Sequence, residues 1–275
     1  MNVSVIILTQ DEEENLPDLL EGLAWCDDIH VVDSGSTDET VTIAKSGGAQ
    51  LVAHAFERFG LQRNWALDHC QIKYPWVLFL DADERCTEAF QLALQKAIET
   101  ASDDVAGFFC CWKLMLYGRW LKRTGYFPNW QFRLLRLGKA RFTDHGHGQK
   151  EGEVLGRIEY IKEPFLHFAF AKGWSAWVER HNRYSTLEAE TRLDHSASFK
   201  DIFSRRSTVR NAALKSLVSR IPGWPLLRFF HVYFLRLGFL DGTPGLIQSI
   251  NVSIYEYLIK LKMREIKRRK VGKPI

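Results

Sequence analysis

Short apolar runs alternate with segments of helical periodicity in the N-terminal part of the chain. The apolar runs are rich in β-branched residues, have the length of strands and end in polar residues, which is typical of strands buried on both faces of a parallel sheet. We expect strands at 3–8, 29–32, 50–53 and 76–80. We expect helices at 15–24, 38–44 and 63–69. This alternation predicts an α/β fold built on a doubly wound sheet.

The pattern changes after Gly107. Aromatic, strand-like segments at 108–116 and 126–137 predict a mixed extension of the sheet. Beyond Trp174 the periodicity is helical, at 177–189, 203–218, 226–237 and 246–262, with breaks at 222–223 and 241–245. We therefore expect one domain over 1–172, in halves of 1–106 and 107–172, followed by a helical subdomain over 173–275.

The composition is that of an ordinary globular protein. Hydrophobic residues make up 46% and charged residues 25% of the 275 residues, which argues against disorder, collagen and a disulfide scaffold. Five scattered cysteines without C-x-x-C spacing argue against a disulfide framework and a zinc site. The first apolar run leads straight into acidic residues, unlike a signal peptide. These features predict a cytoplasmic location.

Positive charge is concentrated at the C-terminus. Residues 260–275 hold eight basic residues and one glutamate, so the rest of the chain has a net charge of about −3. The aromatic segment 224–240 before this basic tail is interrupted by Arg228, His231 and Arg236, so we do not expect it to span a membrane. Helices and tail together predict peripheral attachment to the inner face of a cell membrane. No nucleic-acid-binding module is recognisable, and no nucleic-acid partner is expected.

Acidic residues follow the predicted strands, where ligands bind in open α/β sheets. The first strand leads into Thr9-Gln10-Asp11-Glu12-Glu13-Glu14, which lacks the glycines of a dinucleotide-binding turn, and no P-loop is present. A later strand ends in Asp81-Ala82-Asp83. Two carboxylates at the end of a strand suit Mg²⁺ or Mn²⁺ bridging a substrate diphosphate. In the alternative interpretation, Asp81 and Glu84 only cap a helix that starts near Thr87.

Three segments in fixed order carry a family resemblance. They are 5–16 (VIILTQDEEENL), 31–40 (VVDSGSTDET), and 62–67 (QRNWAL) leading to 78–84 (LFLDADE). The ordered set resembles the family 2 glycosyltransferases. A closer resemblance, extending to the end of the chain, is to the bacterial β-1,4-glucosyltransferase-like group that decorates the lipopolysaccharide inner core. The sequence departs from the family at Gln10 and Asp11, where Tyr-Asn is more usual.

The resemblance implies a GT-A fold, with a mixed, mostly parallel sheet, a Rossmann-like N-terminal half and a helical C-terminal extension. It implies that 1–106 bind a nucleotide-sugar, that 107–172 face the acceptor, and that transfer inverts the anomeric carbon. On the nucleoside side, the resemblance implies that Thr9 and Glu12 lie against the nucleoside and that Asp33 accepts a hydrogen bond from uracil or ribose. It implies that Arg63 reaches the base or the diphosphate. Asp81 and Asp83 would form the D-x-D that holds ribose and metal, and His167 would add a third metal or diphosphate contact.

Other interpretations of these residues stay open at this point. Asp33 is also a good Asx-turn residue in Asp33-Ser34-Gly35-Ser36. Arg63 also fits a solvated helix face. His167 lies in an apolar run, where a histidine is often a hydrogen-bonded core residue.

An inverting transfer needs a carboxylate that takes the proton of the acceptor hydroxyl. The segment 141–151 (RFTDHGHGQKE) is dense in titratable groups, and we expect Glu151 to be the base, with Asp144 as the second choice. Its His145-x-His147 pair has no cysteine partner and no helical spacing, which argues against zinc.

The sequence thus predicts a metal-dependent hexosyltransferase that uses Mg²⁺ or Mn²⁺. It would move a sugar, glucose as the first guess, from a UDP-sugar to a glycan or lipid-linked acceptor in lipopolysaccharide or surface polysaccharide biosynthesis. The alternatives are a polyprenyl-phosphate sugar transferase and a catalytically silent UDP-sugar-binding, membrane-associated protein. A haloacid dehalogenase-type phosphatase is disfavoured because Arg85 stands where its motif needs a hydroxyl residue or valine.

Overall fold

The computed structural model describes residues 1–145, 148–194, 202–204, 210, 213–214, 217 and 221–275. The chain folds into two compact units, Met1–Gly173 and Trp174–Ile275. The predicted helix at 203–218 lies largely outside the described residues.

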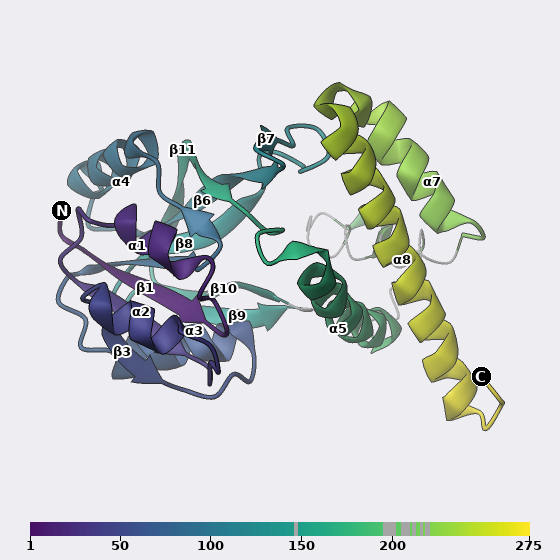
Figure 1. Ribbon diagram of the computed structural model, residues 1–275, viewed down its shortest axis with the longest axis horizontal. Helices are drawn as coiled ribbons and strands as arrows, with labels where there is room; N and C mark the ends of the chain where they lie inside the picture. Colours follow the sequence, from purple (N-terminus) through teal and green to yellow (C-terminus); the bar gives the residue numbers. More distant parts are fainter. Residues whose placement is uncertain (146–147, 195–201, 205–209, 211–212, 215–216, 218–220) are drawn as a thin grey trace. The chain divides into compact units, whose positions relative to one another are not determined.

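The first unit is built around a nine-stranded mixed sheet (Figure 1). Its elements up to the fourth helix are β1 (Val3–Thr9), α1 (Leu16–Glu21), β2 (Ile29–Asp33), α2 (Thr40–Ser46), β3 (Gln50–Ala53), α3 (Phe59–His69), β4 (Trp76–Asp81), β5 (Glu84–Arg85) and α4 (Glu88–Thr100). The remaining strands are β6 (Val105–Leu116), β7 (Arg119–Trp120), β8 (Trp130–Arg136), β9 (Ala140–His145), β10 (Gly148–Val154) and β11 (Arg157–His167).

The sheet has the order β3-β2-β1-β4-β8-β6-β11-β5, with β7 paired to β6, and β9 and β10 form a separate hairpin. The strands β3, β2, β1 and β4 are all parallel, as are β6 and β11. Antiparallel β8 joins these two parallel parts. The predicted α/β fold, with a mixed, mostly parallel sheet and a Rossmann-like N-terminal half, is confirmed.

Two hydrophobic clusters cover the two faces of the sheet. Alternate residues of β1 belong to different clusters. Val5 and Ile7 pack in the cluster that includes residues of α1 and α4, whereas Ile6 packs in the cluster that includes residues of α3 and β9. A strand with apolar residues at every position is expected where both faces are covered. Because β1, β2 and β4 run parallel, their carboxyl ends lie at one edge of this sheet.

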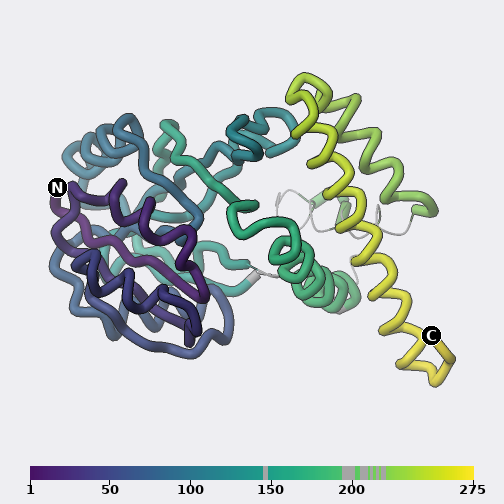
Figure 2. The backbone as a smooth tube through the Cα atoms, viewed as in Figure 1, coloured from purple at the N-terminus to yellow at the C-terminus, as the bar shows by residue number. Residues whose placement is uncertain are grey.

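The second unit is helical. It contains α5 (Gly173–Asp194, which begins at the last residue of the first unit), α7 (Trp224–Phe230), a π-helical turn η2 (His231–Leu235), a 3₁₀ turn η3 (Gly238–Asp241) and α8 (Gly242–Lys270). Figure 2 shows the chain reversing after α7 so that α8 runs back alongside it. Ser253 Oγ of α8 donates to the Pro225 carbonyl of α7 at 2.7 Å.

Two details of this unit differ from the sequence prediction. The break expected at 241–245 is the first turn of α8, because Pro244 falls where a helix has no need of its N–H. The basic tail is helical as far as Lys270. In the part of the chain that is described, none of the helices combines the length and hydropathy that crossing a bilayer requires.

Candidate functional site

Thr9, Asp33 and Asp81 lie together at the carboxyl ends of three adjacent strands. Thr9 is paired with Asp33 across β1 and β2, and Leu8 is paired with Asp81 across β1 and β4. The Thr9 hydroxyl donates to Asp33 Oδ1 at 3.0 Å. The structure therefore brings these three predicted donor-binding residues to one edge of the sheet.

Asp33 closes the turn after β2. Its Oδ2 accepts from the backbone N–H groups of Gly35 and Ser36 at 3.0 and 2.9 Å, and its Oδ1 also accepts from the Ser36 hydroxyl. The Asx-turn interpretation is confirmed, since this network is the turn itself. Contact with uracil or ribose stays a prediction.

Arg63 and Arg133 clamp the carboxylate of Asp81 from two sides. Arg63 Nη2 lies 2.8 Å from Oδ1, and Arg133 Nη2 lies 2.7 Å from Oδ2. Burial alone would raise the pKa of Asp81, but the two guanidinium groups outweigh it and hold that pKa well below its usual range. Both oxygens of this first D-x-D carboxylate are thus already engaged by protein cations.

Arg63 is fully buried, so its interpretation as part of a solvated helix face is wrong. Its guanidinium lies 5.7–5.8 Å from the ring centroids of Phe59, Phe79 and Phe142. Burial lowers the pKa of Arg63 to about 10, against the opposing effect of Asp81. The direct contact that the structure provides is with Asp81, and contact with the donor stays a prediction.

Arg133 is a site residue that the sequence analysis missed. It is buried in β8, and its Nη2 also contacts Glu84 Oε1 at 2.5 Å. Burial opposes its charge, yet the carboxylates of Asp81 and Glu84 raise the pKa of Arg133. A usable signal was present, because an arginine inside the apolar strand Trp130–Arg136 is rarely buried without an acidic partner.

Glu84 completes this buried group and is fully enclosed. Its Oε2 accepts from the Asp81 backbone N–H at 2.9 Å. Burial raises the pKa of Glu84 to about 7, against the opposing charge of Arg133. Helix α4 is instead capped by Thr87, whose side chain accepts from Phe90 N. The interpretation of Asp81 and Glu84 as caps of this helix is therefore wrong.

Asp83 and His167 form a second pair, on the turn after β4 and at the end of β11. Their Oδ2 and Nε2 atoms are 3.4 Å apart, and His167 Nδ1 is buried without a hydrogen-bond partner among the residues that the structure describes. Burial alone would lower the pKa of His167, but the carboxylates, Asp83 foremost, raise it. His167 is thus paired with a carboxylate. The alternative interpretation, a core histidine in an apolar run, did not predict this partner.

This pair fits the cation implied by the resemblance. Mg²⁺ in nucleotide sites is usually bound through one or two carboxylates, and substrate phosphates and waters complete its coordination. Among the described residues, no group of three or more His, Cys, Asp or Glu side chains is arranged to enclose a metal on its own. A carboxylate and an imidazole that face each other suit an ion that arrives with its substrate.

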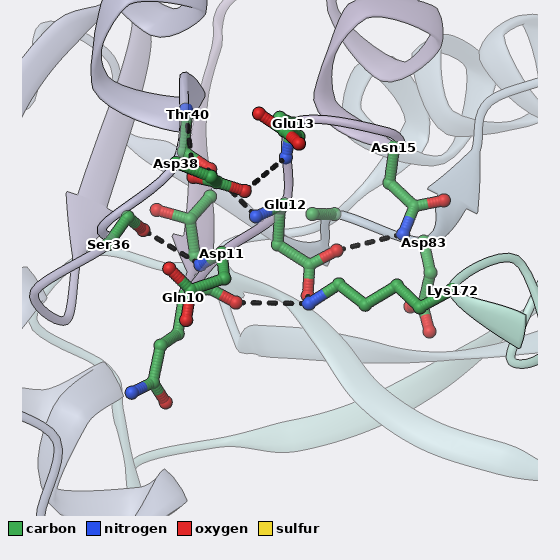
Figure 3. A network of polar contacts seen from close by, with 12 residues as sticks. Gln10, Asp11, Glu12, Glu13, Asn15, Ser36, Asp38, Thr40, Asp83 and Lys172 are labelled. Atoms are coloured by element: carbon green, nitrogen blue, oxygen red, sulfur yellow. Dashed lines mark hydrogen bonds and ion pairs between the residues drawn. The ribbon is translucent and has the colours of Figure 1, made fainter. Parts of the chain in front are cut away.

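The acidic run after β1 has a mainly structural role (Figure 3). Asp11 N donates to Ser36 Oγ while Asp11 Oδ1 accepts from Thr37 N. Glu13 N likewise donates to Asp38 Oδ2, while Glu13 Oε2 accepts from the backbone N–H of residue 39. The turns after β1 and β2 are therefore joined by reciprocal hydrogen bonds. These bonds give the carboxylates of Asp11 and Glu13 a structural role in a turn that lacks the glycines of a dinucleotide-binding site.

Glu12 differs from its neighbours because its carboxylate lies near that of Asp83, the second aspartate of the D-x-D motif. Its Oε1 pairs with Lys172 Nζ at 2.7 Å, and its Oε2 accepts from Asn15 at 2.8 Å. Burial raises the pKa of Glu12, and the nearby Asp83 carboxylate adds to this, while Lys172 opposes it. The contact of Glu12 with the nucleoside stays a prediction.

The two candidate bases lie on the β9–β10 hairpin. Glu151 is exposed on β10, opposite Phe142 of β9. Asp144 instead caps α3, since its Oδ1 accepts from Gly60 N at 2.8 Å, and a Cβ at Gly60 would lie 2.9 Å from that oxygen. Of the histidine pair, His147 lies outside the described residues. The order of preference, Glu151 before Asp144, stays a prediction.

A pocket of about 310 Å³ lies next to the residues that bond to Glu12 and Asp83. It is lined by Glu14, Asn15, Asp18, Arg85, Leu166, Phe168 and Ala171. None of these is a predicted donor-binding or metal residue, although Asn15 and Phe168 are hydrogen-bonded to Glu12 and Asp83.

Comparison with known proteins finds one family model, curated relatives and solved structures that resemble this chain. The family model "Glycosyl transferase family 2" matches residues 4–163. The chain is 26% identical over 271 residues to the lipopolysaccharide core biosynthesis glycosyltransferase LpsC of Rhizobium meliloti, covering 95% of this chain and 91% of that protein. It is 24% identical to the uncharacterized glycosyltransferase RT0209 of Rickettsia typhi, covering 96% and 87%. Among solved structures, S. aureus TarS 1-349 aligns with a TM-score of 0.46 and 18% identity, covering 99% of this chain and 92% of that one.

Proposed function

Since the chain belongs to glycosyltransferase family 2, we propose that it transfers a hexose from a UDP-sugar to a glycan or glycolipid acceptor with inversion, in lipopolysaccharide core or surface polysaccharide biosynthesis. Glucose is our first choice of sugar. The pathway is supported by the likeness to LpsC over nearly the whole of both chains. The observation that carries the proposal is the Asp83–His167 pair at the same sheet edge as Thr9, Asp33 and Glu12.

In the proposed reaction, the acceptor hydroxyl oxygen attacks the anomeric carbon while the bond from that carbon to the diphosphate breaks. Glu151 takes the hydroxyl proton, and UDP leaves. Thr9 and Asp33 would orient the nucleoside, and Asp83 and His167 would hold Mg²⁺ or Mn²⁺. When bound, this cation would neutralise charge on the diphosphate.

Nucleotide binding tests the proposal directly. UDP with Mn²⁺ is expected to raise the melting temperature, because a ligand that binds only the native state adds about 2.7 kcal/mol of stability at a hundred times its Kd. The shift should shrink when EDTA replaces Mn²⁺, and ADP should produce less of it. Equal responses to UDP and ADP would contradict the proposed donor class.

Product analysis separates the alternatives. Incubation with radiolabelled UDP-glucose and a lipopolysaccharide core acceptor should move the label to the acceptor. Label that moves to polyprenyl phosphate would instead support the runner-up transferase. UDP binding with neither transfer nor donor hydrolysis would support the silent binding protein.

Glu151→Gln is expected to lower kcat by about a hundredfold or more, the range of general-base removal. UDP affinity should be unchanged, because Glu151 lies on the β9–β10 hairpin and not at the carboxyl ends of β1, β2 and β4, where we propose that UDP binds. Glu153→Gln is the matched control, since Glu153 is exposed on the same strand. A kcat that falls equally in both variants would remove Glu151 from the mechanism and leave Asp144 as the candidate.

We further propose that the second unit binds an anionic membrane surface. The segment from α7 to η3 exposes eight large apolar side chains: Leu226, Leu227, Phe230, Phe234, Leu235, Leu237, Phe239 and Leu240. The last turn of α8 adds Lys267, Arg268, Arg269 and Lys270. Apolar side chains that enter the lipid interface, together with basic residues beside anionic head groups, are the two signals that stable peripheral binding requires.

Vesicle flotation tests this attachment. The wild-type protein should float with phosphatidylglycerol-containing vesicles and much less with pure phosphatidylcholine. Phe230→Ser combined with Phe234→Ser should weaken binding by about tenfold, the effect expected when two apolar anchors are lost. Leu92→Ser combined with Leu155→Ser is the control, because both leucines are exposed on the first unit. Equal flotation of the two double variants would contradict the proposed surface.

A further inference from the structure

Residues 168–173, which we call the strap, lead out of β11 beside the D-x-D turn. The Phe168 N–H donates to the Asp83 carbonyl at 2.8 Å. Two turns follow, in which Ala171 N donates to the Phe168 carbonyl and Gly173 N to the Phe170 carbonyl, both at 2.9 Å. The strap is thus tied to the same residue whose side chain faces His167.

The strap places the ammonium of Lys172 at the end of β1. Lys172 Nζ lies 2.7 Å from Glu12 Oε1 and 3.0 Å from the Gln10 carbonyl oxygen (Figure 3). An ammonium has three N–H donors, and within the described residues these two atoms are its hydrogen-bond acceptors. The side chain is 27% exposed, and the ammonium has one N–H donor more than these two acceptors use.

The charges around Lys172 support a role beyond pairing with Glu12. The Asp83 carboxylate lies near enough to Glu12, the ion-pair partner of Lys172, to raise the pKa of Glu12. A diphosphate that approached these two carboxylates without a neighbouring cation would be repelled. An ammonium already held at this position reduces that repulsion before any donor binds.

We propose that Lys172 is a donor-binding residue whose third N–H binds a phosphate oxygen of the nucleotide diphosphate, while its ammonium stays anchored to Glu12 and the Gln10 carbonyl. The inference rests on the proposed UDP-sugar donor. Lysine binds phosphate as a compact point charge, and such a charge is worth most where negative charge develops on the departing diphosphate. The sequence analysis did not single out Lys172.

Isothermal titration with UDP and with uridine, both in Mn²⁺, tests the role of Lys172. Lys172→Gln should weaken UDP binding by about tenfold, or about 1.4 kcal/mol, and leave uridine binding unchanged because uridine has no phosphate. Lys172→Arg should keep most of the UDP affinity, since it restores the positive charge. Lys162→Gln, an exposed substitution on β11, is the control and should not change either affinity.

A second substitution distinguishes phosphate binding from simple neutralisation of Glu12. If Lys172 binds phosphate, Glu12→Gln combined with Lys172→Gln should still bind UDP more weakly than the wild type, because removing the repelling Glu12 carboxylate does not replace the lost phosphate contact. Restored UDP affinity in the double variant would overturn the inference, as would an equal loss of UDP and uridine binding. If the wild-type protein binds UDP and Lys172→Gln binds it equally well, only this inference fails. If the wild-type protein binds no UDP, the proposed function fails with it.

Discussion

Asp83→Ala is expected to lower sugar transfer by about a thousandfold or more, which corresponds to about 4 kcal/mol of transition-state stabilisation. The reason is that Asp83 is the D-x-D carboxylate that faces His167, whereas both oxygens of Asp81 are already bound by arginines. The melting temperature of the variant should stay close to that of the wild type, and its Mn²⁺-dependent shift with UDP should disappear.

The assay is the initial rate with labelled UDP-sugar, measured beside thermal unfolding with and without Mn²⁺. Asp103→Asn is the control, because Asp103 is a fully exposed carboxylate on the turn before β6. His167→Ala should resemble Asp83→Ala in losing the Mn²⁺-dependent shift. An Asp83→Ala variant with wild-type turnover would refute the metal-dependent mechanism.

Arg133→Met is expected to destabilise the first unit by about 3–5 kcal/mol, the usual result of leaving buried charges without their partner. The methionine would fill much of the arginine volume, so the loss is that of charge compensation for Asp81 and Glu84. Thermal or urea unfolding measures the effect.

Two further variants identify the cause. Glu84→Gln in the Arg133→Met background should recover part of the stability, because it removes the carboxylate that has lost its arginine, whereas Asp81 keeps its contact with Arg63. Arg157→Met should leave unfolding unchanged, since the ion pairs of Arg157 with Asp104 and Glu159 are exposed. If Arg133→Met is no more harmful than Arg157→Met, the buried cluster does not stabilise the fold.

The strands β1, β2 and β4 were predictable because each is mostly apolar along its length. Ser4 in β1 and His30 in β2 are buried polar exceptions that do not break the pattern. The start of α3 was harder to predict. The helix begins at Phe59, four residues before the predicted start at Arg63, and its cap comes from Asp144 on a distant hairpin. A cap supplied from far along the chain leaves no local signal at the helix start.

The site was predictable where one residue ends a strand, and not where several segments meet. Thr9, Asp33 and Asp81 each follow an apolar run, so strand ends located them. Arg133 and Lys172 come from β8 and the strap, and they reach the edge only because β8 pairs with β4 and β11 pairs with β5. Strand order is a long-range property, and the hydrophobic pattern of a single strand does not specify it.

The reciprocal bonds between the turns after β1 and β2 have a consequence for the energetics of recognition. The two turns are already fixed to each other by hydrogen bonds of Asp11, Glu13, Ser36 and Asp38. Binding of a nucleoside beside these turns would therefore not include the entropic cost of ordering them. The same hydrogen bonds mean that a single substitution in one turn would also disturb the other turn. A change of base specificity would then require substitutions in both turns together.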